Sequence, residues 1–227
     1  MSNYVTGPTT FEQIRWSAAT FRRETNDDAD YIPLYTPEFR RTLLETQDAD
    51  SVKQLLRFVN KWGFRVSYDK GPGIASAITQ AAPHLNPLSG SALEFDDLRC
   101  ATLDVIERAY DSISAADGVG PSTTSLILAL LNPALFVMWN RQIRNAYFPN
   151  DKPNGATYAQ FLTIMRMAAL SITADARSQH GIDDPAGRLS ADLGIEPPFS
   201  LAKFIDEYNW LTLERAMAQQ EGNAVAV

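Results

Sequence analysis

The sequence has one cysteine, no long apolar run and no excess of positive charge. Cys100 alone, among 227 residues, excludes an internal disulfide and an iron–sulfur cluster held by four cysteines. No apolar stretch approaches the roughly 20 residues that a membrane-spanning helix needs, so no membrane role is indicated. The first residues lack the basic and apolar regions of a signal peptide, and we therefore expect a cytoplasmic protein.

Charge limits how this chain can contact nucleic acid. It has 20 basic and 27 acidic residues, whereas proteins that coat DNA without sequence preference usually carry a basic excess. Any surface that binds DNA must therefore be local. The hydrophobic content of 45% is typical of a globular protein with a sizeable core. Cys100 lies among helix-forming residues, so we expect a buried structural thiol.

Apolar residues recur at intervals of three and four along most of the chain, which predicts an all-α protein. Together with capping residues, this spacing predicts helices over 10–23, 37–45, 48–61, 74–82, 91–99, 155–172 and 200–216. Residues 26–30 are expected to form a loop. The segment 174–198 is rich in glycine, proline and aspartate and is expected to be a mobile linker or an insertion.

The most specific pattern lies between residues 103 and 131, where Gly118-Val119-Gly120 separates two apolar stripes with helical spacing. Glycine reaches positive backbone angles, and Pro121 suits the first position of a helix because its missing N–H would be unpaired there. The backbone amides from Gly118 to Ser122 are therefore expected to face outward and to hold one phosphate. The same turn also occurs as a plain connection between two helices.

With the segment that follows, residues 103–148 resemble the helix-hairpin-helix DNA glycosylase superfamily of endonuclease III and its relatives. In that family the hairpin precedes a second helix, a loop with a proline, and an apolar run that ends in the catalytic aspartate. The aspartate falls about twenty residues after the second glycine of the hairpin, and the count from Gly120 ends at Asn140.

The resemblance implies one glycosylase-like unit over residues 1–227, built from two helical lobes with a cleft between them. Residues 74–172 would form the lobe that contains the hairpin, and residues 1–73 and 173–227 would form the second lobe. The family's four-cysteine cluster is excluded. A monovalent cation at the hairpin is the one cofactor that the resemblance leaves open.

The chain departs from the family pattern at two positions. Asn140 stands in place of the catalytic aspartate, and Ser122 stands where members with lyase activity have a lysine nucleophile. Lyase chemistry by the family's route is therefore excluded at Ser122. An amide can orient water but supplies no net charge opposite the cation that develops on the sugar, a loss of roughly two to four powers of ten in rate.

Asn140 fits three explanations. The chain could cleave slowly, or cleave only a labile substrate, with a carboxylate from elsewhere assisting. It could have kept the binding and lost the chemistry, or the asparagine could be an engineered change that traps a complex. Asp206 is the alternative source of acid chemistry, although a buried structural hydrogen bond is the stronger explanation for it. Lys203 and Glu207, four residues apart, are expected to form a surface ion pair.

Further contacts to DNA are expected from two regions. Arg141 and Arg144 share one face of the next helix, where one of them would clamp a phosphate or form a salt bridge with a neighbouring helix. The candidates for a wedge that fills the space of a flipped base, or for stacking on the base, are Trp62, Phe64, Arg65, Tyr68 and Trp139.

The resemblance implies recognition of a modified or damaged base in double-stranded DNA, flipping of that base, and hydrolysis of its N-glycosidic bond without lyase activity. The alternatives are a catalytically inactive DNA-binding protein on the same fold and an N-glycosidase that acts on nucleosides or RNA. Repair, defence against modified foreign DNA and salvage are all compatible settings, and a DNA-bound protein would be associated with the nucleoid. The sequence indicates no particular oligomeric state.

Overall fold

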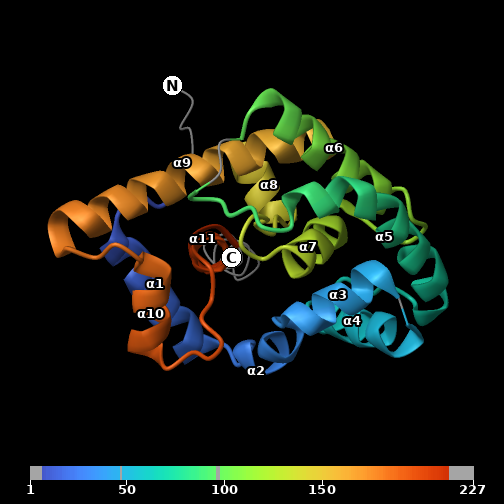
Figure 1. Ribbon diagram of the computed structural model, residues 1–227, viewed down its shortest axis with the longest axis horizontal. Coiled ribbons are helices and arrows are strands. Elements are labelled where there is room, and N and C mark those ends of the chain that lie inside the picture. The colour runs from blue at the N-terminus through green and yellow to red at the C-terminus, as the bar shows by residue number, and fades with distance from the viewer. Residues whose placement is uncertain (1–6, 47, 96–97, 215–227) are drawn as a thin grey trace, which may run out of the picture.

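The computed structural model describes residues 7–46, 48–95 and 98–214. Within these ranges the protein is all-helical, as the sequence predicts, with eleven α-helices and no strand (Figure 1). None of the described helices is long and apolar enough to cross a membrane.

The α-helices are α1 (Phe11–Glu24), α2 (Asp28–Tyr31), α3 (Pro37–Glu45), α4 (Ala49–Lys61), α5 (Gly71–Leu85), α6 (Cys100–Ser114), α7 (Pro121–Leu131), α8 (Arg141–Tyr147), α9 (Gly155–His180), α10 (Pro185–Leu193) and α11 (Leu201–Asn209). Short 3-10 helices are η1 (Ile32–Leu34), η2 (Tyr68–Lys70) and η3 (Asn86–Leu88), and the π-helical turn η4 (Trp210–Glu214) continues α11.

Several helices begin where their capping residues predict. Thr10, Thr36, Asp48 and Ser200 each accept a hydrogen bond from a backbone N–H in the first turn of the helix that they precede. These bonds satisfy N–H groups that have no partner within the helix. The predicted starts of α1, α3, α4 and α11 are confirmed to within one residue, because a cap depends on only a few neighbouring residues.

The predicted helix over 91–99 is wrong. In the part of this segment that the structure describes, the chain forms a turn and stretches without regular secondary structure. The N–H of Leu93 donates to the carbonyl of Ala134 at 2.9 Å, and the side-chain amide of Asn132 donates to the carbonyls of Leu88 and Ser91. Bonds to the loop after α7 thus replace the helical bonds that the local sequence favours.

The linker predicted over 174–198 is also wrong, because α9 extends to His180 and α10 follows. Gly181 and Gly194 have φ values of +66° and +67° and end these two helices, and Asp184 caps α10. Glycine in the left-handed region is the usual helix terminator. The predicted loop at 26–30 likewise contains the start of the short helix α2.

Two smaller expectations also need correction. Helix α5 is longer than predicted at both ends, beginning at Gly71 and continuing past Pro83. Cys100 is exposed rather than buried, because it is the first residue of α6 and the buried stripe of that helix begins at Ile106. The thiol therefore has no packing role in the core.

The helices pack so that both end segments of the chain meet. The long helix α9 runs along one side of the molecule in Figure 1, with α6 against it and α5 against α6. Helix α1 packs against both α9 and α11, and α10 contacts α1, α9 and α11. Helix α7 contacts α3, α4 and α6, so it lies between the N-terminal helices and the middle of the chain.

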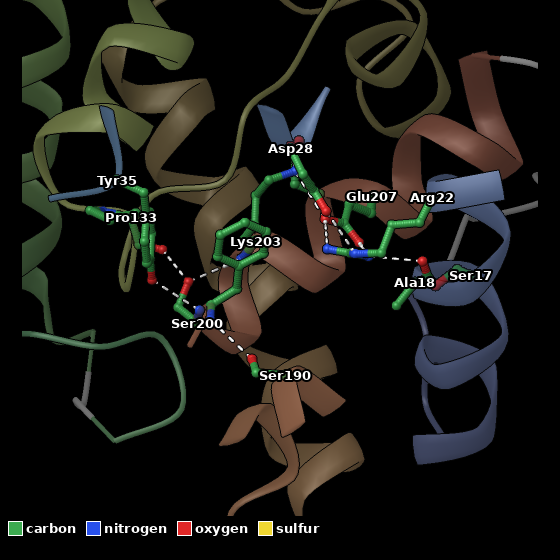
Figure 2. A network of polar contacts seen from close by, with 12 residues as sticks. Ser17, Ala18, Arg22, Asp28, Tyr35, Pro133, Ser190, Ser200, Lys203 and Glu207 are labelled. Atoms are coloured by element: carbon green, nitrogen blue, oxygen red, sulfur yellow. Dashed lines mark hydrogen bonds and ion pairs between the residues drawn. The ribbon is translucent and has the colours of Figure 1, made fainter. Parts of the chain in front are cut away.

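A buried network of charges joins the N-terminal helices to α11 (Figure 2). Arg22 of α1 contacts both carboxylate oxygens of Glu207, at 2.9 and 3.1 Å, and also lies 2.8 Å from Asp28 of α2. Lys203 Nζ lies 3.1 Å from Glu207 Oε1. The predicted pair of Lys203 and Glu207 forms, but its expected surface position is wrong because both side chains are buried.

Lys203 remains charged inside the protein. Burial by itself lowers the pKa of an ammonium, but the carboxylates of Glu207 and Asp206 outweigh this effect and raise the pKa of Lys203 above 10.5. The rings of Phe21 and Tyr31 lie 4.9 and 5.0 Å from Nζ and add cation–π attraction. Because the folded pKa exceeds the unfolded one, this stabilisation is present at neutral pH and is lost only as the pH rises through the folded pKa.

Removing the arginine of this network should destabilise the fold strongly. We expect Arg22→Met to lower the free energy of unfolding by about 3–5 kcal/mol, because Glu207 and Asp28 lose a buried cationic partner. The control is Arg177→Met, whose ion pair with Asp183 is exposed and is worth at most about 1 kcal/mol. Urea denaturation measures both, and equal small losses would contradict a structural role for the network.

Candidate nucleic-acid interface and the adjoining cavity

The hairpin between α6 and α7 contains two glycines with different backbone conformations. Gly118 has φ +80°, so the predicted positive angle is confirmed there. For Gly120 the prediction is wrong, since its φ of −88° and ψ of 173° are extended values that any residue adopts. Pro121 is the first residue of α7, as predicted. The side chain of Val119 is buried and anchors the turn to the core.

The start of α7 is open to solvent. Gly120 is exposed and Ser122 is half-buried, and the helix begins without a cap from a side chain. The N–H groups of a first helical turn have no partner within the helix, and the helix dipole adds partial positive charge there. The geometry therefore suits one anion, as the sequence predicts for a phosphate.

The segment that contains Tyr68 lies beside the hairpin. Lys70 Nζ lies 2.6 Å from Asp117 Oδ2, and a Cβ atom on Gly118 would lie 3.4 Å from Cγ of Lys70. Tyr68, two residues earlier in η2, is 52% exposed. Two regions that lie far apart in the sequence, the aromatic segment after α4 and the hairpin, are thus adjacent in the fold.

Asn140 is the N-cap of α8. The residue is 7% exposed, and Oδ1 accepts a hydrogen bond from the backbone N–H of Ile143 at 2.9 Å. Asparagine and aspartate cap helices about equally well. A structural role thus accounts for an asparagine at this position, whether or not the residue also takes part in chemistry.

The two arginines of α8 are placed differently. Arg141 is exposed, whereas Arg144 is half-buried with its guanidinium carbon 6.0 Å from the ring of Trp139. Burial lowers the pKa of Arg144 from its usual value, with the charge of Arg141 as a lesser cause. Within the described part of the chain neither arginine forms an ion pair, so the salt bridge that was one explanation for them is not seen. Arg141 is the better placed of the two to meet a ligand in solvent.

Trp139 lies inside the core. Its ring is completely buried, with ring centroids 5.2 Å from Tyr158 and 5.4 Å from Phe161. The backbone N–H of Trp139 donates to the hydroxyl of Ser125 at 3.0 Å, and this hydroxyl donates to the backbone carbonyl of Trp139 at 3.2 Å. The prediction that Trp139 stacks on a base is wrong, because the residue is fixed in the aromatic core.

Trp62 and Asp206 line the same small cavity. It lies where the N-terminal helices, α7 and α11 meet, and Leu126 and Ala129 of α7 form part of its wall together with Met138, two residues before Asn140. It leaves about 20 Å³ for the centre of a water-sized sphere, which is room for one water molecule. The aromatic and charged residues that line it are Tyr31, Phe58, Trp62, Phe136, Lys203 and Asp206.

Asp206 extends the buried charge network to this cavity. It is 8% exposed, and Oδ2 lies 3.8 Å from Lys203 Nζ. Together with Arg22, Asp28 and Glu207, these residues comprise two cations and three carboxylates, a surplus of one negative charge. Lys203 and Asp206 are the two members of the network that line the cavity.

Sequence reasoning did not identify Lys203 as a residue of this site. Its spacing of four from Glu207 is the same for a surface pair and a buried pair, so the spacing carries no information on burial. The available signal was the sequence around Lys203, because this residue lies within the apolar run Leu201–Ile205.

No family model, curated protein or solved structure matches the chain.

The two hairpin glycines should respond differently to alanine. We expect Gly118→Ala to cost about 1–2 kcal/mol of stability, because a side chain disfavours the left-handed region. Gly120→Ala is the matched control, since its backbone is extended and no atom lies within 4 Å of the added Cβ. We expect a change within about 0.5 kcal/mol for this variant in urea denaturation. Equal losses in the two variants would contradict the observed turn.

Proposed function

We propose that this protein binds double-stranded DNA, turns a modified or damaged base out of the duplex and hydrolyses its N-glycosidic bond. The observation that carries the proposal is that α7 connects an exposed turn, whose geometry suits an anion, to the cavity. Its first turn follows Gly118–Gly120, and its residues Leu126 and Ala129 line the cavity. At 1.5 Å per residue, Pro121 and Ala129 are about 12 Å apart along the helix. One rigid element would thus set the distance between a bound phosphate and a base.

Asp206 supplies the chemistry in this proposal. Cleavage of the N-glycosidic bond develops positive charge on the sugar, and a buried carboxylate fixed beside it lowers the barrier. Asp206 lines the cavity and adds one negative charge to a network in which the other charges, those of Arg22, Lys203, Asp28 and Glu207, balance. It therefore provides the charge that Asn140 cannot, while Asn140 holds the start of α8. Asp206 also accepts a proton from the attacking water.

Entry of a base requires that one wall of the cavity moves. Tyr31, Phe58 and Phe136 are buried, whereas Trp62 is partly exposed and directly precedes Gly63, whose φ is +84°. Trp62 is therefore the aromatic wall residue that can be displaced with the least loss of packing. In this proposal Trp62 swings outward and then stacks on the base that enters.

A second candidate function is DNA binding without catalysis on the same scaffold. The observation that favours it is the cap at α8, because the bond to Ile143 gives Asn140 a structural role. The two functions differ in whether free base is released. Incubation with a panel of duplexes that carry modified bases, scored for abasic sites, separates them directly.

Asp206→Asn should abolish base release. We expect a decrease of about 100-fold or more in the rate of abasic-site formation, with DNA affinity unchanged, because the carboxylate acts on the transition state. The control is Asp192→Asn, which removes a carboxylate from an exposed ion pair with Arg188. Similar rates for Asp206→Asn and the unmodified protein would contradict the assigned role. Absence of base release from every duplex, with DNA binding retained, would favour the non-catalytic function.

Asn140→Asp tests the position at which the family has its aspartate. The fold should be preserved, because aspartate is an equally good N-cap and its charge suits a helix N-terminus. If Asp206 already supplies the charge, a carboxylate at position 140 should not increase base release. An increase of several powers of ten would instead assign catalysis to position 140 and contradict the role of Asp206.

A further inference from the structure

Another hollow lies at the end of α7 that is opposite the hairpin. Its volume is about 540 Å³, within the range of sites that hold small ligands. It is formed where α3 meets the last residues of α5 and α7, and α3 packs against both of these helices. Among the described residues, none lines both this hollow and the cavity at Asp206. The hollow is therefore a separate candidate site.

Part of the wall of this hollow is aliphatic. Leu44 of α3, Leu85 of α5 and Leu131 of α7 line it, so each of the three helices contributes one leucine. Leu85 and Leu131 belong to the core, and Leu44 is half-buried. Contact with such side chains removes the apolar surface of a ligand from water. The hollow can therefore hold the apolar part of a ligand.

Two arginines of α3, Arg40 and Arg41, also line the hollow. Arg40 is half-buried, and its guanidinium carbon lies 5.9 Å from the centre of the Tyr35 ring, a contact that uses none of the N–H donors. The hydroxyl of Tyr35 accepts a hydrogen bond from the N–H of Ser200 at 3.0 Å, which holds this ring in place (Figure 2). Within the described part of the chain, neither guanidinium forms an ion pair or a hydrogen bond. Their donors are thus available to an anion in the hollow.

The charges at the hollow do not balance. Of the described residues that line it, Glu45 is the only carboxylate, and it follows Arg41 by four positions. The two form no ion pair, in keeping with the less favourable order in which the cation precedes the anion along a helix. Two guanidinium groups and one carboxylate leave a surplus of one positive charge, in a chain with 27 acidic and 20 basic residues. A ligand with one negative charge would balance this surplus.

We propose that this hollow binds an apolar carboxylic acid, whose carboxylate meets Arg40 and Arg41 and whose aliphatic body packs against the three leucines. A guanidinium and a carboxylate form two parallel N–H···O bonds, so their pairing is strong and geometrically specific. A phosphate monoester carries nearly two negative charges at neutral pH and would be repelled more strongly by Glu45. The inference is independent of the proposed function, because it concerns a different set of residues.

Octanoate is the probe that tests the inference. It is titrated into the full chain, and the shifts of the backbone amides are followed by nuclear magnetic resonance. Octanamide lacks the charge, acetate lacks the chain, and octyl phosphate adds a second charge. We expect the amides of Ser89 and Asn132, which line the hollow, to shift with octanoate. Octanoate should bind at least about tenfold more tightly than octanamide and acetate, and more tightly than octyl phosphate.

Two outcomes of this titration would overturn the proposal. One is equal affinity for octanoate and octanamide, because the arginines would then contribute nothing to recognition. The other is a set of shifts confined to other parts of the chain, because octanoate would then bind elsewhere.

Variants assign the preference to its residues. Arg41→Met should weaken octanoate by about tenfold and leave octanamide unchanged, because it removes an exposed charge and keeps the apolar wall. The matched control is Arg57→Met, an exposed arginine of α4 that does not line the hollow, and it should leave octanoate binding unchanged. Thermal melts show whether each variant is folded. Octanoate affinity that survives Arg41→Met would overturn the proposal.

Glu45→Gln tests the charge of the ligand. The substitution removes a repulsive carboxylate, so it should tighten octyl phosphate more than octanoate, since the phosphate carries the larger charge. The opposite order would contradict a site matched to a single negative charge.

Duplex DNA distinguishes this site from a nucleic-acid surface. We expect Arg41→Met to leave the affinity for a DNA duplex at low salt unchanged. A loss of DNA affinity in this variant, together with no binding of octanoate to the unmodified chain, would assign the arginines to contacts with phosphate and overturn the proposal.

Discussion

The contact of Arg22 with Glu207 is the interaction on which the rest of this structure depends. The two residues are 185 positions apart, and both lie where an unpaired charge would be strongly unfavourable. Their pairing fixes α11 against α1, and Asp28 adds α2 to the same network. Tyr31 lies at the end of α2, so the network also sets one aromatic wall of the cavity.

Contacts between residues far apart in the chain, of which this is one, also explain which parts of the fold the sequence could not predict. Helix starts at Thr10, Thr36 and Asp48 depend on bonds within three residues, and sequence reasoning places them correctly. The helix expected over 91–99 fails because Leu93 bonds to Ala134, a partner about forty residues away. Local propensity is decisive only where no distant partner competes for the backbone.

The candidate site likewise combines features that the local sequence predicts with features that only tertiary packing sets. The turn at Gly118 and the helix that begins at Pro121 follow from local backbone chemistry and were predicted. That Trp62 and Asp206 line one cavity was not predicted, because they lie on elements that only tertiary packing brings together. The burial of Lys203 was missed for the same reason, since its environment is set by residues of α1 and α2.

Lys203 belongs to both the network and the cavity, and under the proposed function it would link stability to recognition. Glu207 holds the ammonium in place, so a ligand that accepts from Lys203 meets a donor that needs no reorganisation. The same arrangement makes Lys203 unsuitable for separating the two roles, because its removal would leave Glu207 with less buried positive charge.

Asp206 is the residue at which recognition and stability separate. Its oxygen is 3.8 Å from Lys203, whereas Glu207 is 3.1 Å from Lys203 and also bound twice by Arg22. The closely paired Glu207 thus helps to hold α11 against α1, whereas Asp206 also lines the cavity. Of these neighbours on one helix, Glu207 is the one that the network fixes on both sides, and Asp206 is the one to which the proposed function assigns chemistry.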